Sequence, residues 1–342
     1  MKEVIMKPVK LFNAEGGDSF EDQAILGGNT TGIANKNNIR YPWVQPLYRK
    51  MVGNFWIPQK VSLVEDKVTF KQLDPAEERA FRLTISFLIF LDNFQVANLP
   101  NVAEFISCPA IRDLLTVQGF QEVIHSETYQ YILEALYPSM QRDEIYNLWR
   151  NCPILKKRIQ FIADIAERFK AAPTEANFID VVIANFILEG LYFYQGFDFF
   201  HNLAHRKKLV QTDKEITYIQ TDENTHLAIF INILKEMGVK DFAERVYSMT
   251  AEAVQHEIDW CHFVYGDEIL GISRRSSEAR VKVLANKRLK NLGLDPLYPD
   301  VVDPYKHIED SQSVGGARGN FFEAGAVTAY DTADSVSGWD SL

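Results

Sequence analysis

Cysteine is scarce in this sequence, and its scarcity excludes two kinds of scaffold. The 342 residues contain three cysteines, Cys108, Cys152 and Cys261, which are odd in number and widely spaced. A disulfide framework or a zinc knot would need closely spaced pairs, so neither is indicated. Residues 1–17 also lack the continuous apolar stretch of a signal peptide, because acidic residues interrupt them. We expect a protein of the reducing cytoplasm.

Positive charge is in short supply as well. The 36 lysines and arginines face 46 aspartates and glutamates, which leaves a net charge of −10 at pH 7. Proteins that bind nucleic acid or anionic lipid need lysine and arginine clustered on one face. We therefore expect the partners of this chain to be proteins or small molecules rather than nucleic acids or membranes.

Long uninterrupted apolar runs are missing too. Residues 81–99 and 181–200 are apolar enough to raise the question of membrane spans, but Asp92 interrupts the first run, and Glu189 and Asp198 interrupt the second. Charged side chains are costly at the centre of a bilayer. Helices buried in the core of a globular protein are the favoured interpretation.

Helix signals are what the sequence has in abundance. Hydrophobic residues make up 46% of the chain and charged residues 24%, which is typical of a globular protein with a large core. Asp74 and Pro75, followed by Glu77, form the N-cap, first-position proline and capping glutamate of a helix start. Strand signals are few beyond this point, so we predict an all-α fold. Further helices are expected at residues 109–136, 142–170 with a break near Pro153, 174–201, 212–237, 241–270 and 276–291.

The two ends differ from this helical middle. Residues 13–40 are rich in glycine and asparagine, and we expect residues 1–40 to form a poorly ordered N-terminal arm. Residues 311–342 are rich in small and polar residues, which is typical of a tail that docks on a partner, although a frayed terminus is the alternative. The apolar side chains kept in this tail are Phe321, Phe322, Tyr330, Trp339 and Leu342. We predict a metal-binding helical domain at 41–300 and a flexible C-terminal tail at 301–342.

One spacing occurs twice on the expected helices, a glutamate followed three residues later by a histidine. The two matches are Glu122 with His125 and Glu223 with His226. This spacing places a carboxylate and an imidazole on one face, a turn apart. Each match is preceded by a helix with a single acid embedded in apolar sequence, Asp92 and Glu189 respectively. A carboxylate from each of two helices and a Glu-x-x-His from each of two others is the ligand set of the di-iron and di-manganese carboxylate bundles.

These six residues together are hard to explain as structural acids and histidines. An unpaired carboxylate among apolar side chains either costs several kcal/mol or becomes protonated, and a bridged pair of cations removes that cost. Asp92 or Glu189 alone could equally be paired with lysine or arginine. The full donor set suits octahedral iron or manganese better than structural zinc. The sequence therefore predicts a dinuclear metal site in the core of a helical bundle.

Two further acid and histidine pairs have the same spacing, Asp198 with His201 and Asp259 with His262. At about 100° per residue, Asp198 falls on the opposite side of its helix from Glu189, so its pair is not expected at the site. The other pair has no matching helix with a single acid. We do not expect either pair to bind the metals.

Tyr129 and Asp222 are the candidates for a supporting role. Tyr129 lies one turn after His125, so its ring is expected on the ligand face, with ordinary core packing as the alternative. The apolar residues expected around it are Phe193, Phe197 and Ile219. Dry surroundings of this kind would protect a radical. Asp222, beside Glu223, could orient a ligand histidine or be a solvated helix acid.

These residues resemble those of a known family, the small, radical-generating beta subunit of class I ribonucleotide reductase, over residues 41–342. The motifs that carry the resemblance are Asn54-Phe55-Trp56, Phe90-Leu91-Asp92, Glu122-Val123-Ile124-His125-Ser126 followed by Tyr129, Leu188-Glu189, and Asp222-Glu223-x-x-His226. The resemblance implies a ferritin-like bundle, a cytoplasmic homodimer, and a role in making deoxyribonucleotides for DNA replication. The metals would react with an oxygen species to make an oxidant. The oxidant would pass to an active-site cysteine of the large catalytic subunit, where the ribonucleotide is reduced.

The resemblance also implies a role for each residue. One metal would be bound by Asp92, Glu122 and His125. The other would be bound by Glu189, Glu223 and His226, and the bridging carboxylates would be Glu122 and Glu223. The radical tyrosine would be Tyr129, and the relay from the metals would be Trp56, Asp222 and, on the tail, Tyr330. The tail, with its Ser337-Gly338-Trp339-Asp340-Ser341-Leu342 end, would dock on the large subunit.

Some questions stay open at the level of the sequence. Two irons and two manganeses both suit the donor set, with a mixed pair less favoured, and the oxidant could be a tyrosyl radical or a high-valent metal pair. A ferritin-like oxidase or oxygenase would share all six ligands but would need an open substrate pocket and no tail. Ferritin-like iron storage would need a compact, shell-forming bundle. The presence of both Trp56 and Tyr330 favours the reductase subunit over these alternatives.

Overall fold

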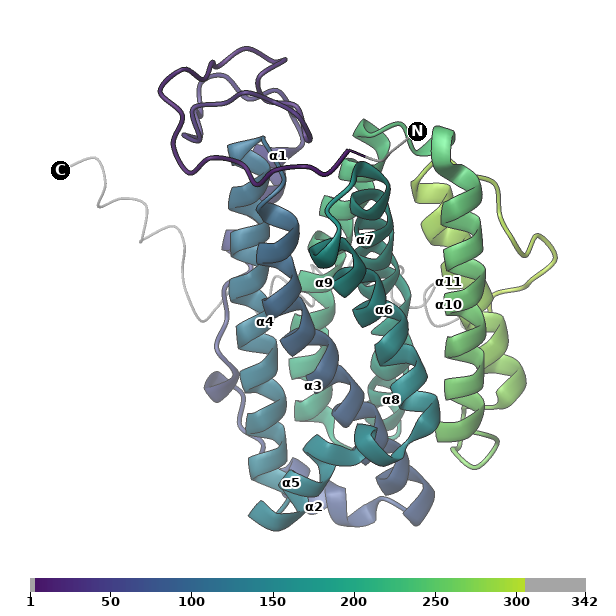
Figure 1. Ribbon diagram of the computed structural model, residues 1–342. Coiled ribbons are helices and arrows are strands. Elements are labelled where there is room, and N and C mark those ends of the chain that lie inside the picture. The colour runs from purple at the N-terminus through teal and green to yellow at the C-terminus, as the bar shows by residue number, and fades with distance from the viewer. Residues whose placement is uncertain (1–3, 305–342) are drawn as a thin grey trace, which may run out of the picture.

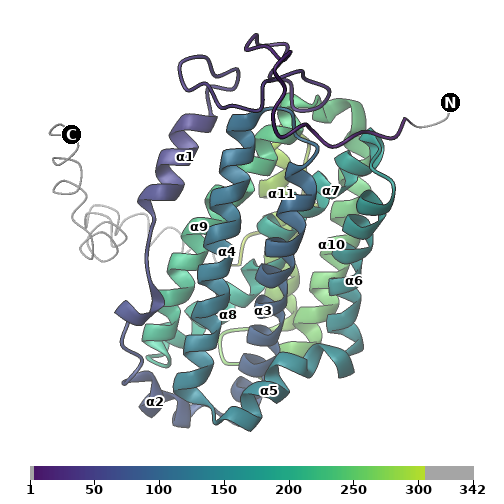
Figure 2. The same cartoon turned by 60° about the vertical axis from the view of Figure 1, so that its left-hand side comes forward.

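The long helices lie side by side in the computed structural model, which describes residues 4–304 (Figure 1, Figure 2). In this part of the chain the only strand-like feature is an isolated bridge between Gly17 and Thr30. The long helices are α3 (Pro75–Ala103), α4 (Pro109–Leu136), α6 (Pro153–Ala171), α7 (Glu175–Ile187), α8 (Tyr194–His205), α9 (Val210–Glu236), α10 (Ala243–Val264) and α11 (Arg274–Asn291). The predicted all-α fold is confirmed.

Local signals in the sequence determine where several of these helices begin. The Asp74 side chain accepts a hydrogen bond from the backbone N–H of Glu77, and the Glu77 carboxylate accepts one from the N–H of Asp74, so α3 starts with a capping box. Prolines occupy the first position of α3, α4 and α6, where the missing N–H has no helical partner to lose. Thr174 caps α7 by accepting from the N–H of Asn177 at 3.2 Å. These starts agree with those expected from the sequence.

Several short elements were not expected. They are α1 (Val44–Gly53), η1 (Pro58–Lys60), α2 (Asp66–Thr69), η2 (Phe70–Gln72) and η5 (Val239–Phe242). The helix expected at 142–170 is present as α5 (Ser139–Asn147), η3 (Leu148–Asn151) and α6, with the expected break before Pro153. Helix α1 buries only Val44 and Met51, so its hydrophobic pattern is too brief to stand out in the sequence. The expected helix at 174–201 is also divided, because a π-helical turn, η4 (Leu188–Tyr192), lies between α7 and α8.

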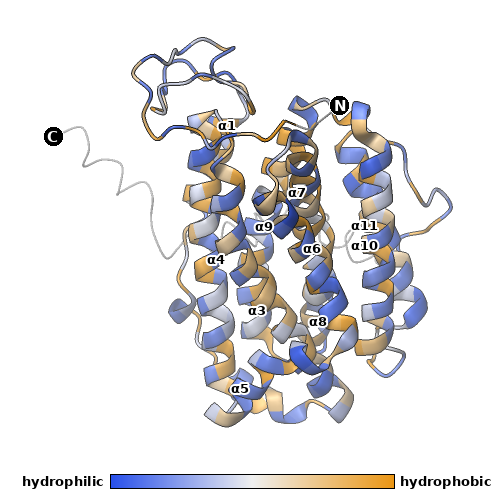
Figure 3. Ribbon diagram, in the orientation of Figure 1, coloured by the Kyte–Doolittle hydropathy of each residue, from blue (hydrophilic) through white to orange (hydrophobic). Residues whose placement is uncertain are grey.

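The segment formed by α7, η4 and α8 is the centre of the molecule. Helices α3, α6, α9, α10 and α11 all pack against it. By length and composition, Pro75–Ala103 and Glu175–His205 could each cross a membrane, but 67% and 78% of their most apolar windows are buried inside the bundle. Figure 3 shows hydrophobic residues gathered along α3 and α7. Both are therefore accounted for as core helices.

The N-terminal segment, residues 4–40, contains no helix and passes over one end of the bundle (Figure 1). The backbone N–H of Met6 donates to the carbonyl of Pro173 at 2.7 Å, and that of Val9 donates to the carbonyl of Glu104 at 2.8 Å. The division into arm, helical domain and tail stays a prediction. Residues 305–342, including Tyr330, lie outside the described residues.

Glu215 on α9 is a buried glutamate outside the six-residue cluster, and burial changes its pKa. Its side chain is fully buried, and neither carboxylate oxygen has a hydrogen-bond partner within residues 4–304. Burial raises the pKa of Glu215 to about 9. The folded chain therefore keeps a proton that the unfolded chain releases near pH 4.3, so stability falls as the pH rises between these two values.

We expect Glu215→Gln to remove this pH dependence. Relative to the wild type, its melting temperature should be higher by roughly 5 °C at pH 8, with the difference shrinking towards zero near pH 5. Thermal unfolding of the metal-free chain at both pH values measures this. Glu236→Gln, an exposed position on the same helix, is the control. An equal difference at both pH values would contradict the buried, protonated state.

Candidate metal centre

Six buried side chains converge between four helical segments. They are Asp92 on α3, Glu122 and His125 on α4, Glu189 on η4, and Glu223 and His226 on α9. All six have 0% of their surface exposed. They form two groups, each with ligand atoms within 4.8 Å of one another, and Glu122 and Glu223 belong to both. The structure thus brings together all six residues that the sequence singled out as ligands.

Both histidine rings turn the same nitrogen towards the carboxylates. The Nδ1 atom of His125 lies 3.1 Å from Asp92 Oδ1 and 3.1 Å from Glu223 Oε1. The Nδ1 atom of His226 lies 2.9 Å from Glu223 Oε2 and 3.2 Å from Glu122 Oε1. The centres of the two rings are 5.7 Å apart. The inward nitrogens are therefore positioned to donate lone pairs to two neighbouring cations.

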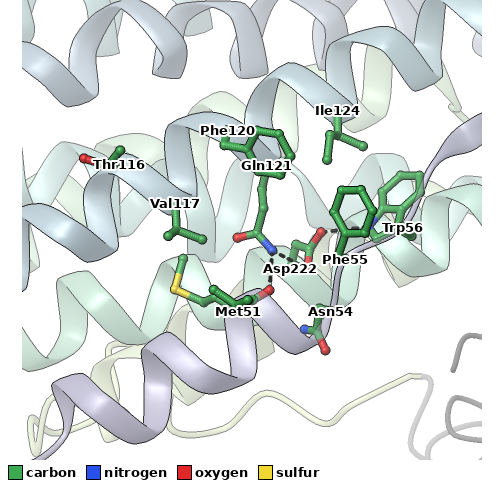
Figure 4. A pocket seen from close by; sticks show the side chains of 11 residues that line it. Met51, Asn54, Phe55, Trp56, Thr116, Val117, Phe120, Gln121, Ile124 and Asp222 are labelled. Carbon is green, nitrogen blue, oxygen red and sulfur yellow. Dashed lines mark hydrogen bonds between the residues drawn. The ribbon is translucent and has the colours of Figure 1, made fainter. Parts of the chain in front are cut away.

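The outward nitrogens are held by hydrogen bonds. His125 Nε2 donates to Asp222 Oδ2 at 3.2 Å, and the same oxygen accepts from Trp56 Nε1 at 2.9 Å. His226 Nε2 donates to Gln121 Oε1 at 3.0 Å, and Gln121 Nε2 donates to Asp222 Oδ1 at 2.9 Å (Figure 4). These bonds keep a proton on Nε2 of each ring, so Nδ1 is the nitrogen that would bind a metal.

Trp56 lies at the outer end of this network. Its ring is 6.0 Å from the His125 ring and nearly parallel to it, and it is 5.3 Å from the Tyr218 ring. Trp56 and Asp222 line a pocket, together with mainly apolar side chains of α1, α4 and the segment after α1 (Figure 4). The volume of this pocket is about 250 Å³. The network therefore runs from His125 to a pocket near the surface of the bundle.

Burial and mutual repulsion act strongly on the carboxylates. Burial raises the pKa of Asp92 and of Glu189 well above the ordinary values, and neighbouring carboxylates add to both shifts. Glu223 behaves in the opposite way, because His226 holds its pKa below the ordinary value in spite of burial. Without bound metal ions, the negative charge of the carboxylates must therefore be offset by protons.

The residues present fit a pair of divalent cations. Each of the four carboxylates has one oxygen without a hydrogen-bond partner in the described part of the chain: Asp92 Oδ2, Glu122 Oε2, Glu189 Oε2 and Glu223 Oε1. Buried oxygens in this state are costly unless something binds them. Two divalent cations would balance the four negative charges and occupy the free lone pairs. Oxygen and imidazole donors of this kind suit iron and manganese.

Tyr129 is fully buried on α4, and its hydroxyl has no hydrogen-bond partner within residues 4–304. Burial raises its pKa well above the ordinary value, and the neighbouring carboxylates, Asp92 foremost, raise it further. Phe193, Phe197 and Ile219, the apolar residues expected around it, are all fully buried, and their place beside Tyr129 stays a prediction. Burial and the neighbouring carboxylates together keep the phenol protonated.

The other acid and histidine pairs lie elsewhere. Asp198 pairs with Arg280 at 2.9 Å, and His201 pairs with Asp213 at 2.6 Å. Neither residue belongs to the two ligand groups, as expected, although the count of 100° per residue behind that expectation does not hold across η4. His262 is half-buried, and its Nε2 atom lies 3.3 Å from the carbonyl oxygen of Arg274.

Sequence reasoning missed three glutamines. Gln118 donates to Glu189 at 2.8 Å, Gln95 also donates to Glu189, and Gln121 holds His226. A signal was available for two of them, since Gln118 lies four residues before Glu122, and Gln95 lies three after Asp92, on the ligand faces of apolar helices. These neutral amides hold the ligands by hydrogen bonds, Gln118 and Gln95 as donors and Gln121 as an acceptor.

The sequence matches the family described as ribonucleotide reductase, small chain, over residues 33–304. The chain belongs to this family. The ribonucleoside-diphosphate reductase subunit beta of Treponema pallidum is 36% identical over 336 residues, which cover 95% of each chain. The ribonucleotide reductase R2 subunit from Clostridium botulinum has a TM-score of 0.86 and 40% identity, covering 90% of this chain and 99% of that one.

A putative class I ribonucleotide reductase from Bacillus halodurans is also similar, with a TM-score of 0.82, 34% identity, and coverage of 88% of this chain and 97% of that one. The resemblance stated from the motifs is confirmed, and so is the ferritin-like fold. The small chain is a component of ribonucleoside-diphosphate reductase that works with a large subunit. The oxidase, oxygenase and iron-storage alternatives are thereby set aside.

Gln121 gives the clearest test of whether hydrogen bonds to the ligand histidines support metal binding. We expect Gln121→Leu to weaken metal binding by roughly 10- to 100-fold, because His226 loses the acceptor that orients its ring. Titration of the metal-free chain with Mn²⁺ measures the affinity. Gln130→Leu, an exposed glutamine on the same helix, should bind as the wild type does. Unchanged affinity in Gln121→Leu would show that the ring is held by packing alone.

Proposed function

We propose that each of the two overlapping groups of side chains holds one metal ion. Glu122 and Glu223, which belong to both groups, would bridge the pair. The observation that carries this proposal is the unpartnered oxygen on each of the four buried carboxylates. The cofactor would be two irons or two manganeses, since the donor set suits both.

When bound, the metal pair supplies a strong one-electron oxidant after reaction with an oxygen species. Tyr129 is the residue we propose to yield the electron. Its phenol stays protonated until that moment, because burial and the carboxylates raise its pKa. Among the carboxylates, Asp92 contributes most to the raised pKa of Tyr129, and its Oδ2 atom accepts no hydrogen bond among the described residues. Asp92 is therefore the group best placed to influence the phenolic proton.

Trp56 and Asp222 would form the path by which the oxidising equivalent leaves the metal centre. Asp222 accepts hydrogen bonds from both Trp56 and His125, so a change of charge at His125 is felt at the indole. We propose that the oxidising equivalent passes along this path and through Tyr330 to a cysteine of the large subunit. Tyr330 lies outside the described residues, so its role rests on the family resemblance.

The proposed partners follow from the same resemblance. The C-terminal tail, 301–342, would dock on the large subunit through its aromatic and aliphatic side chains. A homodimer in the cytoplasm is proposed as the working form. The net charge of −10 supports neither nucleic acid nor membrane as a partner.

Tyr129→Phe tests the radical role. We expect purified wild-type protein to give a tyrosyl radical signal in electron paramagnetic resonance, and the variant to lose both that signal and activity with the large subunit. Tyr131→Phe is the matched control, because Tyr131 lies on the same helix and donates to the carbonyl of Val61 at 2.9 Å. A coupled manganese signal and full activity in Tyr129→Phe would place the oxidant on the metals and make the tyrosine a bystander.

Truncation after His307 tests the role of the tail. Because all six proposed ligands lie within residues 92–226, we expect metal content and thermal stability to be unchanged. Activity with the large subunit should fall to background, and co-sedimentation with it should be lost. A truncated chain that still supports full nucleotide reduction would refute docking through the tail.

A further inference from the structure

The turn that carries Glu189 differs in geometry from the segments that carry the other ligands. Asp92, Glu122, His125, Glu223 and His226 all lie on regular α-helices, whereas Glu189 lies in the π-helical turn Leu188–Tyr192. A π turn contains an extra residue relative to an α turn, so its loss would rotate the side chains on one side of it by about 100°. The register of η4 therefore decides whether Glu189 points at the cluster.

Two arginines from other helices bind the backbone of this turn. Arg288 on α11 donates from Nε to the carbonyl oxygen of Gly190 at 2.9 Å. Arg158 on α6 donates from Nη2 to the carbonyl oxygen of Tyr192 at 3.3 Å. Hydrogen bonds from a charged donor are stronger than those between neutral groups. The turn thus has two charge-assisted anchors next to the residue that carries the carboxylate.

Gly190 allows Arg288 to come this close. A Cβ atom at position 190 would lie 3.2 Å from Leu227 Cδ1, 3.3 Å from Arg288 Cγ and 3.4 Å from Arg288 Cδ. The stem of the arginine therefore packs directly over the glycine. Its guanidinium group lies 4.5 Å from the centre of the Tyr194 ring, and the Tyr194 hydroxyl donates to Asn224, the neighbour of Glu223, at 2.8 Å.

Arg158 also binds other residues of the core, which makes it unsuitable for a mutational test of η4. It is 1% exposed, forms an ion pair with Glu257, and lies over the ring of Phe87 at 3.6 Å. Its removal would leave Glu257 buried without a partner, so a general loss of stability would hide any effect on η4. Arg288 is only partly buried and its described contacts are to the turn and to Tyr194, which makes it the informative position.

We propose that Arg288 is a positioning residue that holds the π turn, and through it Glu189, in the register that binds metal. This inference rests on the proposed dinuclear centre and adds a part to it. Glu189 needs such an anchor more than the other ligands do, because its own side chain is held by the neutral amides of Gln95 and Gln118. Arg288 acts through the backbone of Gly190 and does not touch the metals.

The test compares Arg288→Met, which keeps the stem but removes the donor, with Arg288→Lys, which keeps a charged donor. Lys290→Met is the matched control, because it removes an exposed positive charge from the same last turn of α11. The full-length, metal-free chain is studied first by amide hydrogen exchange over residues 188–194. Mn²⁺ is then added without oxygen, and the unbound ion is counted by electron paramagnetic resonance.

In Arg288→Met we expect amide exchange in residues 188–194 to be roughly tenfold faster, because one charge-assisted hydrogen bond is lost. Amide exchange in α4 should be unchanged. Bound Mn²⁺ should fall from two ions per chain towards one, since only the group that includes Glu189 is affected. Arg288→Lys should recover most of both properties, and Lys290→Met should match the wild type.

Wild-type exchange and two bound ions in Arg288→Met would overturn the proposal, and so would an equal loss in Lys290→Met or faster exchange throughout the chain. If Arg288→Met does not fold, Gly190→Ala takes its place, because the added methyl group pushes the arginine stem away and should give the same local effect. Absence of Mn²⁺ binding by the wild type would refute the metal centre itself, whereas the exchange comparison would still decide whether Arg288 holds the turn.

Discussion

The rest of the structure depends on the free-energy cost of burying four carboxylates next to one another. Two other buried acids are neutralised by cations of the chain, since Glu77 binds Lys208 at 2.6 Å and Glu257 binds Arg158, whereas Glu215 is kept protonated. The four carboxylates of the centre contact histidines and glutamines in the described part of the chain, and no lysine or arginine. The positive charge that they need must therefore come from outside, as protons or as metal ions.

The groups around the cluster make its two halves unequal. His125 donates to a carboxylate, Asp222, whereas His226 donates to the neutral amide of Gln121. A carboxylate partner raises the basicity of an imidazole more than an amide does, so the two rings are not equivalent as ligands. The same Asp222 also binds Trp56, which couples only the His125 side directly to the indole.

Much of this could be predicted from the sequence, because its signals are local or periodic. Capping residues and prolines marked the helix starts, and the Glu-x-x-His spacing together with Asp92 and Glu189 marked all six cluster residues. The π turn could not be predicted, because its anchors are Arg158 and Arg288, which lie on helices far from it in the sequence. The expectation that Asp198 lies away from the cluster was correct, although the count behind it assumed an unbroken helix through η4.

The two halves of the centre also differ in how closely the rest of the bundle covers them. The half that contains Glu189 is enclosed, because α10 and α11 pack over η4 and an arginine lies against the turn. On the side that contains His125, Asp222 and Trp56 line the pocket and are joined to His125 by hydrogen bonds, and the indole retains 9% exposure. This arrangement agrees with the proposed route of the oxidising equivalent through Asp222 and Trp56, since the turn that carries Glu189 is covered by other helices.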